Sequence, residues 1–312
     1  MNNIPQTASD SFFEIGIDLG GTKTEVILLG PDAAVLFRKR VATPCREGYG
    51  PILQCIFHLI EEARAHIPPR IPHTIGIGIP GSISAATGAV QNANTTCLIG
   101  RPLHLDIERV LGRTVVVEND ANCFTLAECR EGAAQGYGLV FGIIMGTGCG
   151  GGICVNGHVR TGPHHIAGEW GHYAVDPNGA PCYCGNRGCV ETKISGGGVE
   201  AAFYERYGRI ISMQSILQGY RCGDAECVET FNRFLDDFGR CLGGLISTLD
   251  PDAVVLGGGL SNIDELYTLG LERVKKYVFC DQLTTPILKN TLGDSAGVFG
   301  AAWIGADAIR SS

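Results

Sequence analysis

One histidine and three cysteines form the clearest chemical pattern in this chain of 312 residues. Cys182, Cys184 and Cys189 lie within eight residues of one another and follow His172 by ten positions or more. One imidazole and three thiolates complete a tetrahedral set for Zn²⁺ with no open position, so zinc held there would be structural. Ordinary reduced cysteines are the alternative. A zinc-bound histidine also keeps its second ring nitrogen as an oriented donor.

Two glycine-rich turns have the composition of anion-binding loops. Gly20-Gly21-Thr22, with Lys23 next to it, and Gly146-Thr147-Gly148 each follow an apolar strand and lead into another. The backbone N–H groups and threonine hydroxyls of such hairpin turns can surround a phosphate. Two plain β-turns are the alternative. Asp18 favours the phosphate site, because a carboxylate inside an apolar strand is costly and suits hydrated Mg²⁺.

A third glycine run, Gly257-Gly258-Gly259, ends an apolar strand at residues 253–256. Glycine there would let a flat ligand such as adenine or ribose lie against the backbone, although a simple strand-to-helix turn is equally compatible. The sequence assigns no role to a fourth run, Gly196 to Gly198.

Asp120 is the candidate general base. It lies in Glu118-Asn119-Asp120-Ala121-Asn122, between a strand and a helical pattern. There it could take a proton from an alcohol that attacks phosphorus, and the positive end of the helix dipole would keep it ionised. In the alternative interpretation, Asn119 or Asp120 only caps the helix.

Two segments match the G-x-G-x-x-G pattern, the first through Gly76, Gly78 and Gly81 and the second through Gly146, Gly148 and Gly151. A dinucleotide site needs a helix to open at the motif, and neither segment predicts one, so a nicotinamide-dependent oxidoreductase is not favoured. The chain has no Gly-Lys pair, which excludes the P-loop.

The elements that must position these residues alternate between strands and helices. Strands are expected at 13–29, 74–79, 114–117, 139–145 and 253–256, and apolar residues recur at helical spacing over 52–63 and 231–245. This order predicts an α/β fold. Gly16 to Lys23 can be laid over Gly142 to Cys149, which indicates two similar halves.

Composition excludes several classes of protein. The chain is too long for one small core, and its 45 glycines are roughly twice the usual share of about 7 %. A net charge of −8 with no basic run argues against nucleic acid and anionic membranes as partners. Met1 to Asp10 do not resemble a signal peptide, so we expect a cytoplasmic protein with fourteen reduced cysteines. Gly132 to Gly157 is uncharged but too rich in glycine for a membrane helix.

The motifs together resemble those of the ROK family of sugar kinases and repressors. They occur in that family's order, as Asp18-Leu19-Gly20-Gly21-Thr22-Lys23, Glu118-Asn119-Asp120-Ala121-Asn122, Gly146-Thr147-Gly148, Gly168-Glu169-Trp170-Gly171-His172 and the Cys182 to Cys189 cluster. The resemblance implies a two-lobed actin-like, ribonuclease H-like fold with a duplicated βββαβα core, with ATP and sugar in the cleft between the lobes. It further implies a small lobe at 1–119 plus 296–312, a large lobe at 120–295 with a zinc loop at 172–189, and a homodimer.

The resemblance also implies roles for particular residues. Asp120 would be the general base, and His172 would hold zinc and a sugar hydroxyl at once. ATP with Mg²⁺ would lie against Asp18, Lys23 and the three glycine segments Gly20 to Thr22, Gly146 to Gly148 and Gly257 to Gly259. The sugar-binding residues would be Gly81, Asn94, Asn119, Asp120, Glu169, His172 and Glu191.

Three short segments, Pro80 to Ser84, Asn92 to Asn94 and Gly293 to Ser295, resemble the bacterial fructokinase and mannokinase branch. Cys97 departs from that branch, where a tryptophan is expected. The expected activity is therefore ATP-dependent phosphorylation of a hexose 6-hydroxyl, with fructose first and mannose second. N-acetylglucosamine kinase and glucokinase of the same family are alternatives, as is a non-catalytic sugar sensor. Only about 14 residues precede the first strand, too few for the helix-turn-helix of family repressors, so DNA binding is not expected.

Overall fold

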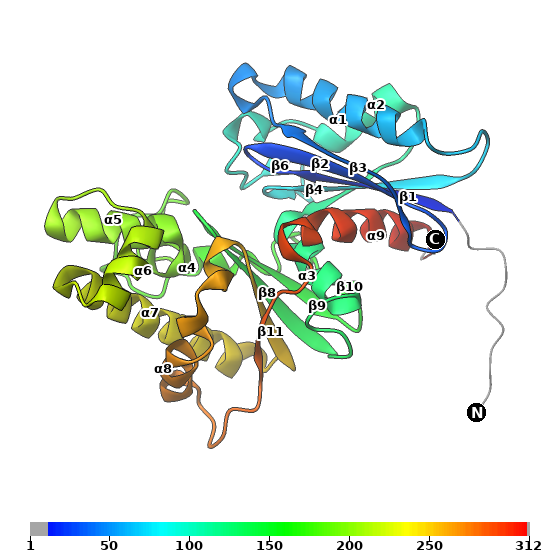
Figure 1. Cartoon of the computed structure of the whole chain (residues 1–312). Helices are drawn as coiled ribbons and strands as arrows, with labels where there is room; N and C mark the ends of the chain where they lie inside the picture. Colours follow the sequence, from blue (N-terminus) through cyan, green and yellow to red (C-terminus); the bar gives the residue numbers. More distant parts are fainter. Residues whose placement is uncertain (1–11, 311–312) are drawn as a thin grey trace, which may run out of the picture. The chain divides into compact units, whose positions relative to one another are not determined.

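The computed structural model describes residues 12–310, and these form two compact units (Figure 1). Unit 1 contains residues up to Cys123, the short segment Pro163–His165 and the chain from Ser295 onward; unit 2 contains Phe124–Gly162 and Ile166–Asp294. The units thus divide after residues 123 and 294, whereas the predicted lobes divide after 119 and 295. The segment Met1 to Asp10, which is not expected to be a signal peptide, lies outside the described residues.

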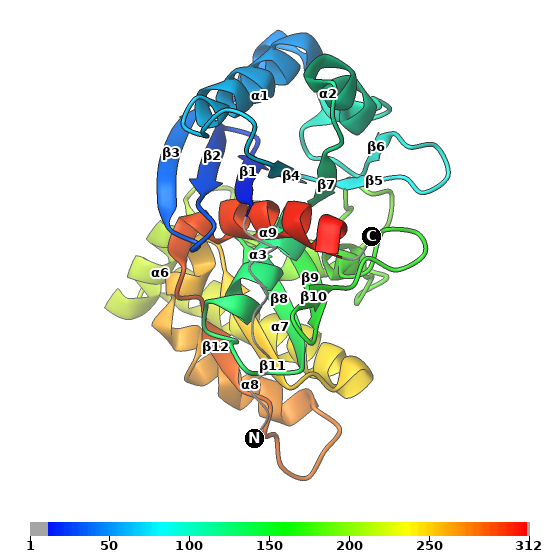
Figure 2. The same ribbon diagram turned by 90° about the vertical axis from the view of Figure 1, so that its right-hand side faces the viewer.

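Unit 1 is built on a mixed five-stranded sheet with the order β3-β2-β1-β4-β7. β1 (Phe13–Leu19), β2 (Lys23–Leu29) and β3 (Val35–Ala42) form an antiparallel meander, and β4 (His73–Ile79) and β7 (Val116–Asn119) continue the sheet parallel to β1. Figure 2 shows α1 (Tyr49–Arg64) and α2 (Leu103–Leu111) on one face of this sheet and α9 (Ala296–Arg310) on the other. A small hairpin of β5 (Ser82–Ile83) and β6 (Val90–Gln91) completes the unit.

Two glycines allow α9 to pack directly on the sheet of unit 1. Gly16 of β1 and Gly76 of β4 are partners in the parallel register. A Cβ atom on Gly16 would lie 2.3 Å from the Val298 carbonyl oxygen, and one on Gly76 would lie 1.8 Å from that of Ala301. Gly76, the first glycine of one G-x-G-x-x-G match, therefore serves helix packing.

Unit 2 repeats the topology of unit 1. Its sheet order is β10-β9-β8-β11-β12, in which β8 (Leu139–Met145), β9 (Cys149–Val155) and β10 (His158–Val159) form the meander. β11 (Ala253–Gly257) and β12 (Ile287–Lys289) extend it in parallel with β8. The predicted α/β fold with a duplicated core is confirmed, and the strands expected from residues 13, 74, 114, 139 and 253 are all present.

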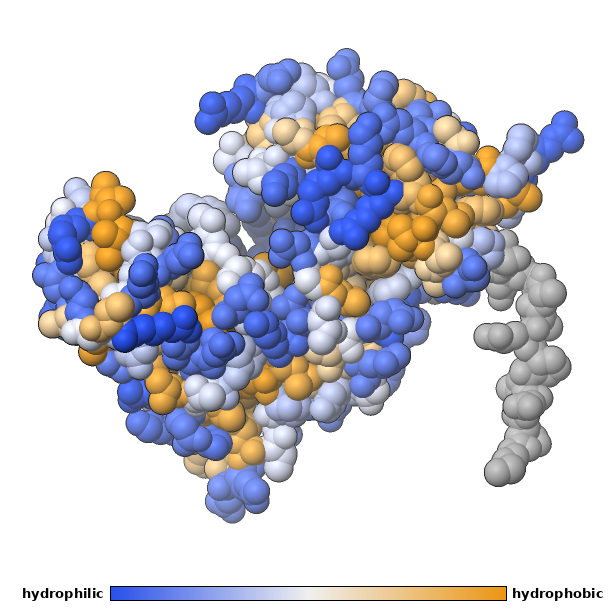
Figure 3. All heavy atoms as spheres, viewed as in Figure 1, coloured by the Kyte–Doolittle hydropathy of each residue, from blue (hydrophilic) through white to orange (hydrophobic). Residues whose placement is uncertain are grey.

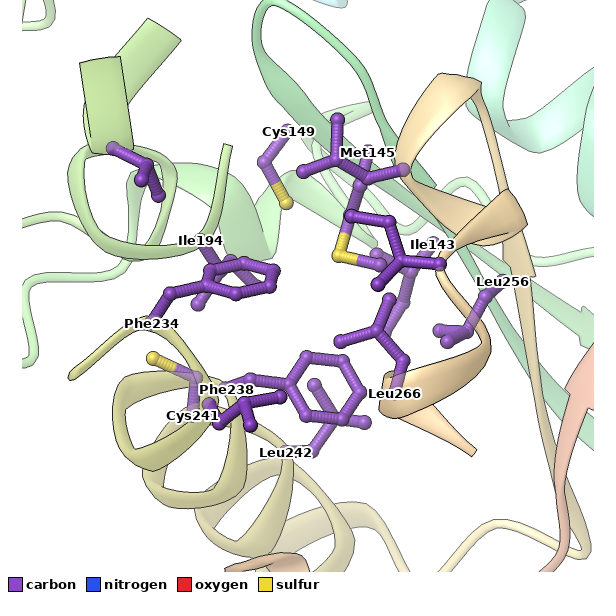
Figure 4. Close-up of a cluster of buried hydrophobic side chains, with 14 of the residues drawn as sticks. Ile143, Met145, Cys149, Ile194, Phe234, Phe238, Cys241, Leu242, Leu256 and Leu266 are labelled. Atoms are coloured by element: carbon purple, nitrogen blue, oxygen red, sulfur yellow. The ribbon is translucent and has the colours of Figure 1, made fainter. Parts of the chain in front are cut away.

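Helices follow the meander of unit 2 and cover its sheet. They are α4 (Val190–Ile194), α5 (Gly196–Tyr207), α6 (Met213–Cys222), α7 (Ala225–Leu249) and α8 (Leu269–Tyr277), while α3 (Asp120–Arg130) begins in unit 1 and continues into unit 2. Short 3₁₀ turns lie at Cys45–Glu47, Thr96–Leu98, Glu169–His172, Gly259–Asn262, Asp264–Leu266 and Gly293–Ser295. Figure 4 shows how Phe234, Phe238 and Leu242 of α7 meet Ile143 and Met145 of β8 in the core.

Among residues 12–310, no helix combines the length and the apolar character that crossing a bilayer requires. The face drawn in Figure 3 mixes hydrophilic and apolar side chains on each unit.

Candidate active site

The first glycine turn, Gly20 to Thr22, connects β1 and β2 in unit 1. Three donors that follow β3 occupy its carbonyl oxygens: Thr43 Oγ1 donates to Gly20 O at 2.8 Å, the Thr43 amide to Thr22 O at 2.9 Å, and Cys45 Sγ to Gly21 O at 2.9 Å. Hydrogen bonds from these donors offset the partial negative charge of the carbonyl oxygens. An anion can therefore approach the amide groups of the turn. Gly21, Thr22 and Lys23 are exposed, as a binding turn requires.

The second glycine turn, Gly146 to Gly148, connects β8 and β9 in unit 2. Its carbonyls are held by backbone alone, since the Gly196 amide donates to Gly146 O at 2.8 Å and the Gly197 amide to Thr147 O at 3.1 Å. A Cβ atom on Gly197 would lie 2.7 Å from Thr147 O. The run that opens α5, to which the sequence assigned no role, therefore lets a helix N-terminus approach this turn.

Glu191 also contacts the second turn. Its Oε2 accepts a hydrogen bond from the Cys149 amide at 2.9 Å, and a Cβ atom on Gly148 would lie 2.6 Å from that oxygen. Burial, together with the charge of Glu191, raises the pKa of Glu169. The two predicted sugar-binding carboxylates of unit 2 therefore interact with each other.

The predicted metal ligands come together in unit 2. One ligand atom from each of His172, Cys182, Cys184 and Cys189 lies within 4.8 Å of the others. Cys184 Sγ is 3.6 Å from Cys189 Sγ, and Cys182 Sγ is 3.6 Å from His172 Nδ1. A tetrahedron with metal–sulfur bonds of about 2.3 Å has edges of roughly 3.8 Å, so the cluster fits zinc with Nδ1 as the nitrogen ligand.

The other nitrogen of His172 has a partner that the sequence did not predict. Its Nε2 lies 3.0 Å from the hydroxyl of Tyr183, which stands between two of the cysteines. The nitrogen expected to serve a sugar hydroxyl therefore contacts a tyrosine of the zinc loop.

Asp18 and Asp120 both lie in unit 1 and interact electrostatically. Burial, followed by the charges of Asp120 and Glu25, raises the pKa of Asp18 to about 7, and the charge of Arg40 only partly offsets this. A cation beside these carboxylates would relieve their repulsion, so the pair fits hydrated Mg²⁺.

The helix cap at α3 is made mainly by Asn119. Its Oδ1 accepts hydrogen bonds from the amides of Ala121 at 2.9 Å and Asn122 at 3.2 Å, while its Nδ2 donates to Gly81 O at 3.1 Å. Asp120 follows as the first residue of α3, and its Oδ1 accepts from the Ala121 amide at 2.8 Å. The capping interpretation thus applies to Asn119, and the helix dipole stabilises the charge of Asp120.

The remaining predicted site residues differ in how much space they leave for a ligand. Gly257 packs against Phe124, whose ring would lie 2.4 Å from an added Cβ, and Gly258 has a φ of 76°. Gly259 is exposed, with no atom within 4 Å of an added Cβ. Asn94 is exposed and accepts a hydrogen bond from Thr95 Oγ1 at 3.4 Å.

The predicted residues are divided between the two units. Unit 1 carries Asp18, Gly20 to Lys23, Gly81, Asn94, Asn119 and Asp120, and unit 2 carries Gly146 to Gly148, Glu169, His172, Glu191 and Gly257 to Gly259. Sequence reasoning missed Thr43, Cys45 and Tyr183, which no motif marks. It noticed the glycine run at 196 but could not assign it.

Comparisons with known proteins agree over nearly the whole chain. Residues 14–308 match the ROK family. The N-acetyl-D-glucosamine kinase of Yersinia pseudotuberculosis (serotype O:3, strain YPIII) is 40% identical over 299 residues, covering 93% of this chain and 97% of that protein. The enzyme with the same name from Pectobacterium atrosepticum is 38% identical over 297 residues, 92% of this chain and 97% of its own.

Solved structures share the fold. A ROK hexokinase from Thermus thermophilus has a TM-score of 0.86 and 28% identity, covering 96% of this chain and 100% of its own. A ROK glucokinase from Streptomyces griseus, in complex with glucose and AMPPNP, has a TM-score of 0.77 and 30% identity, covering 95% and 99%. These matches confirm the predicted ROK-type, actin-like fold.

Proposed function

Because this chain belongs to the ROK family, we propose that it is an ATP-dependent sugar kinase, which transfers the γ-phosphoryl group to the 6-hydroxyl of a hexose. The observation that carries the proposal is the similarity over 93% of the chain to an N-acetylglucosamine kinase. The Streptomyces griseus glucokinase, solved with glucose and AMPPNP, supports a sugar and a nucleotide as the two substrates.

N-acetylglucosamine is the first candidate acceptor. The relatives at 38–40% identity carry that activity in their names, which supports the alternative from the sequence better than the fructokinase branch. Fructose, mannose and glucose are therefore the comparison sugars. N-acetylglucosamine carries a 2-acetamido group where glucose and mannose carry a 2-hydroxyl, and a pocket built to hydrogen-bond the amide N–H and carbonyl can distinguish the two strongly.

In the proposed reaction, Asp120 takes the proton of the sugar 6-hydroxyl. The oxygen then forms a bond to the γ-phosphorus as the bond to the bridging oxygen of ADP breaks. Glu169, His172 and Glu191 of unit 2, with Asn94, Asn119 and Gly81 of unit 1, would bind the sugar. The turns at Gly20 and Gly146, with Lys23 and Gly257 to Gly259, would bind ATP.

Two metals complete the proposal. Asp18 would hold hydrated Mg²⁺, which offsets the phosphate charge when it is bound. His172, Cys182, Cys184 and Cys189 would hold a structural zinc ion, supported by a spacing that fits the tetrahedral edge. Metal analysis of protein purified without chelator should find one zinc per chain, and protein with less than stoichiometric zinc would contradict this assignment.

A coupled ADP-release assay tests the function. The protein is mixed with Mg-ATP and, separately, with N-acetylglucosamine, glucose, mannose and fructose. We expect sugar-dependent ADP release with the largest kcat/KM for N-acetylglucosamine. A larger value for fructose would restore the fructokinase interpretation. Sugar binding without ADP release would support the non-catalytic sensor instead.

A further inference from the structure

Tyr183 belongs to the zinc loop, yet its hydroxyl lies beside a predicted sugar-binding residue. The hydroxyl is 3.0 Å from His172 Nε2, and the two rings meet edge to face with centroids 5.0 Å apart. The residue as a whole is 65% exposed. The side chain is therefore largely open to solvent, while its hydroxyl has a defined partner.

Nε2 of His172 has one hydrogen bond to donate, so Tyr183 and a sugar hydroxyl cannot both accept it. Nδ1 faces the cysteine cluster, 3.6 Å from Cys182 Sγ, so Nδ1 is the nitrogen that would bind the metal. A neutral imidazole that ligates through Nδ1 carries its single proton on Nε2. Nε2 can then donate one hydrogen bond, and the Tyr183 oxygen accepts it.

The surroundings of Tyr183 are those of the proposed acceptor site. Glu191, one of the proposed sugar-binding carboxylates, accepts a hydrogen bond from the Cys149 amide at 2.9 Å. Tyr183, Glu191 and Thr147 also line one cavity of about 390 Å³ within unit 2. The Tyr183 hydroxyl, 3.0 Å from His172 Nε2, also occupies the position that a sugar hydroxyl bonded to that nitrogen would need.

We infer that Tyr183 sets the affinity of the acceptor site by competing with the sugar for His172. Its hydroxyl occupies Nε2 in the sugar-free protein, and a sugar hydroxyl displaces it on binding. This inference rests on the proposed function. It assigns a role to the residue between Cys182 and Cys184.

The test is the substitution Tyr183→Phe, which removes the competing oxygen and keeps the ring. The dissociation constant of N-acetylglucosamine, measured by calorimetry on zinc-loaded protein, should fall about 2- to 10-fold, the worth of one neutral hydrogen bond. KM for the sugar should fall by the same factor with kcat unchanged. An unchanged dissociation constant would overturn the inference. A raised one would do so as well, since it would make Tyr183 a direct sugar ligand.

Tyr173→Phe is the matched control. Tyr173 is 66% exposed, adjoins His172 in sequence and has no hydrogen bond from its hydroxyl among the described contacts. This variant should bind the sugar as the unmodified protein does.

A second measurement separates failure of the inference from failure of the proposed function. The side-chain nitrogen signals of His172 are followed by NMR in the sugar-free, zinc-loaded protein. Tyr183→Phe should move the Nε2 signal, whereas Tyr173→Phe should not. If N-acetylglucosamine does not bind the unmodified protein while the signal moves, the choice of acceptor is at fault. If the signal does not move, the contact itself is absent and the inference is wrong.

Discussion

The glycine turns of unit 1 and unit 2 have the same hairpin form, but different donors hold their carbonyl oxygens. The turn at Gly20 is held largely by side chains, the Thr43 hydroxyl and the Cys45 thiol. The turn at Gly146 is held by the backbone amides of Gly196 and Gly197. The two halves of the duplicated fold thus stabilise the same kind of turn with different donors, mainly side chains in unit 1 and backbone amides in unit 2.

The surroundings of the two turns differ as well. The first turn lies next to Asp18 in β1, which Asp120 influences electrostatically. The second is tied through Glu191 to α4, which begins immediately after the zinc-cluster residue Cys189. Substitution of the carboxylates beside the first turn should therefore reduce the chemical rate, whereas substitutions around the second turn and the cysteine cluster should weaken substrate binding.

The largest effect is expected for Asp120→Asn, on the unit 1 side of this comparison. Removing the general base should lower kcat about 100- to 10,000-fold, with little change in KM for ATP or in KM for the sugar. The amide keeps an oxygen that can accept from the Ala121 amide, so α3 should remain folded. Steady-state kinetics measure kcat and the two KM values separately. A near-normal kcat would show that Asp120 is not the base.

Cys184→Ala tests the unit 2 side. Loss of one of four ligands should cost more zinc affinity than the roughly 10- to 100-fold typical of outer-shell substitutions. KM for the sugar should rise about tenfold because His172 loses its orientation. Zinc content, melting temperature and KM are measured. Cys280→Ala, at an exposed cysteine outside the cluster, is the control. Unchanged sugar affinity in a folded, zinc-free variant would contradict the link.

Gly197→Ala tests how the second turn is held. The added Cβ would lie 2.7 Å from Thr147 O, so the hydrogen bond to that oxygen must break. We expect KM for ATP to rise about 5- to 10-fold, with KM for the sugar less affected. Gly244→Ala in α7 has no atom within 4 Å of the new methyl group and should leave KM unchanged. Equal kinetics for both variants would remove the role assigned to Gly197.

Thr43→Val tests the first turn and should have the smallest effect. The change removes the hydroxyl that donates to Gly20 O but keeps the Thr43 amide that donates to Thr22 O. Loss of one of three donors should raise KM for ATP about 2- to 5-fold. If Thr43→Val raised KM for ATP more than Gly197→Ala does, the first turn would depend more on its side-chain donor than the second turn depends on its backbone donors, contrary to this account.

The sequence predicted most of what is local in this molecule. The hairpins around both turns and the cysteine cluster all lie within short stretches of chain, where spacing and apolar periodicity carry enough information. Asp120 was placed at the start of a helix for the same reason, and the structure has α3 begin there.

What the sequence could not predict are contacts between distant parts of the chain. Gly16 and Gly76 make room for α9, more than 200 residues later, and the run at Gly196 packs on a turn 50 residues earlier. Such pairings depend on the assembled sheets. The Tyr183 contact to His172 is shorter in range but depends on which histidine nitrogen faces the cysteines, and residue spacing cannot specify this.

Phosphorus NMR of a reaction mixture tests the central claim most directly. With the unmodified protein, Mg-ATP and N-acetylglucosamine, we predict a new phosphate-ester signal coupled to the two protons on C6 of the sugar. The signal should be absent when the 6-deoxy sugar is supplied. ATP that stays intact with N-acetylglucosamine, glucose, mannose and fructose alike, or a phosphate on another carbon, would contradict the proposal of a hexose 6-kinase.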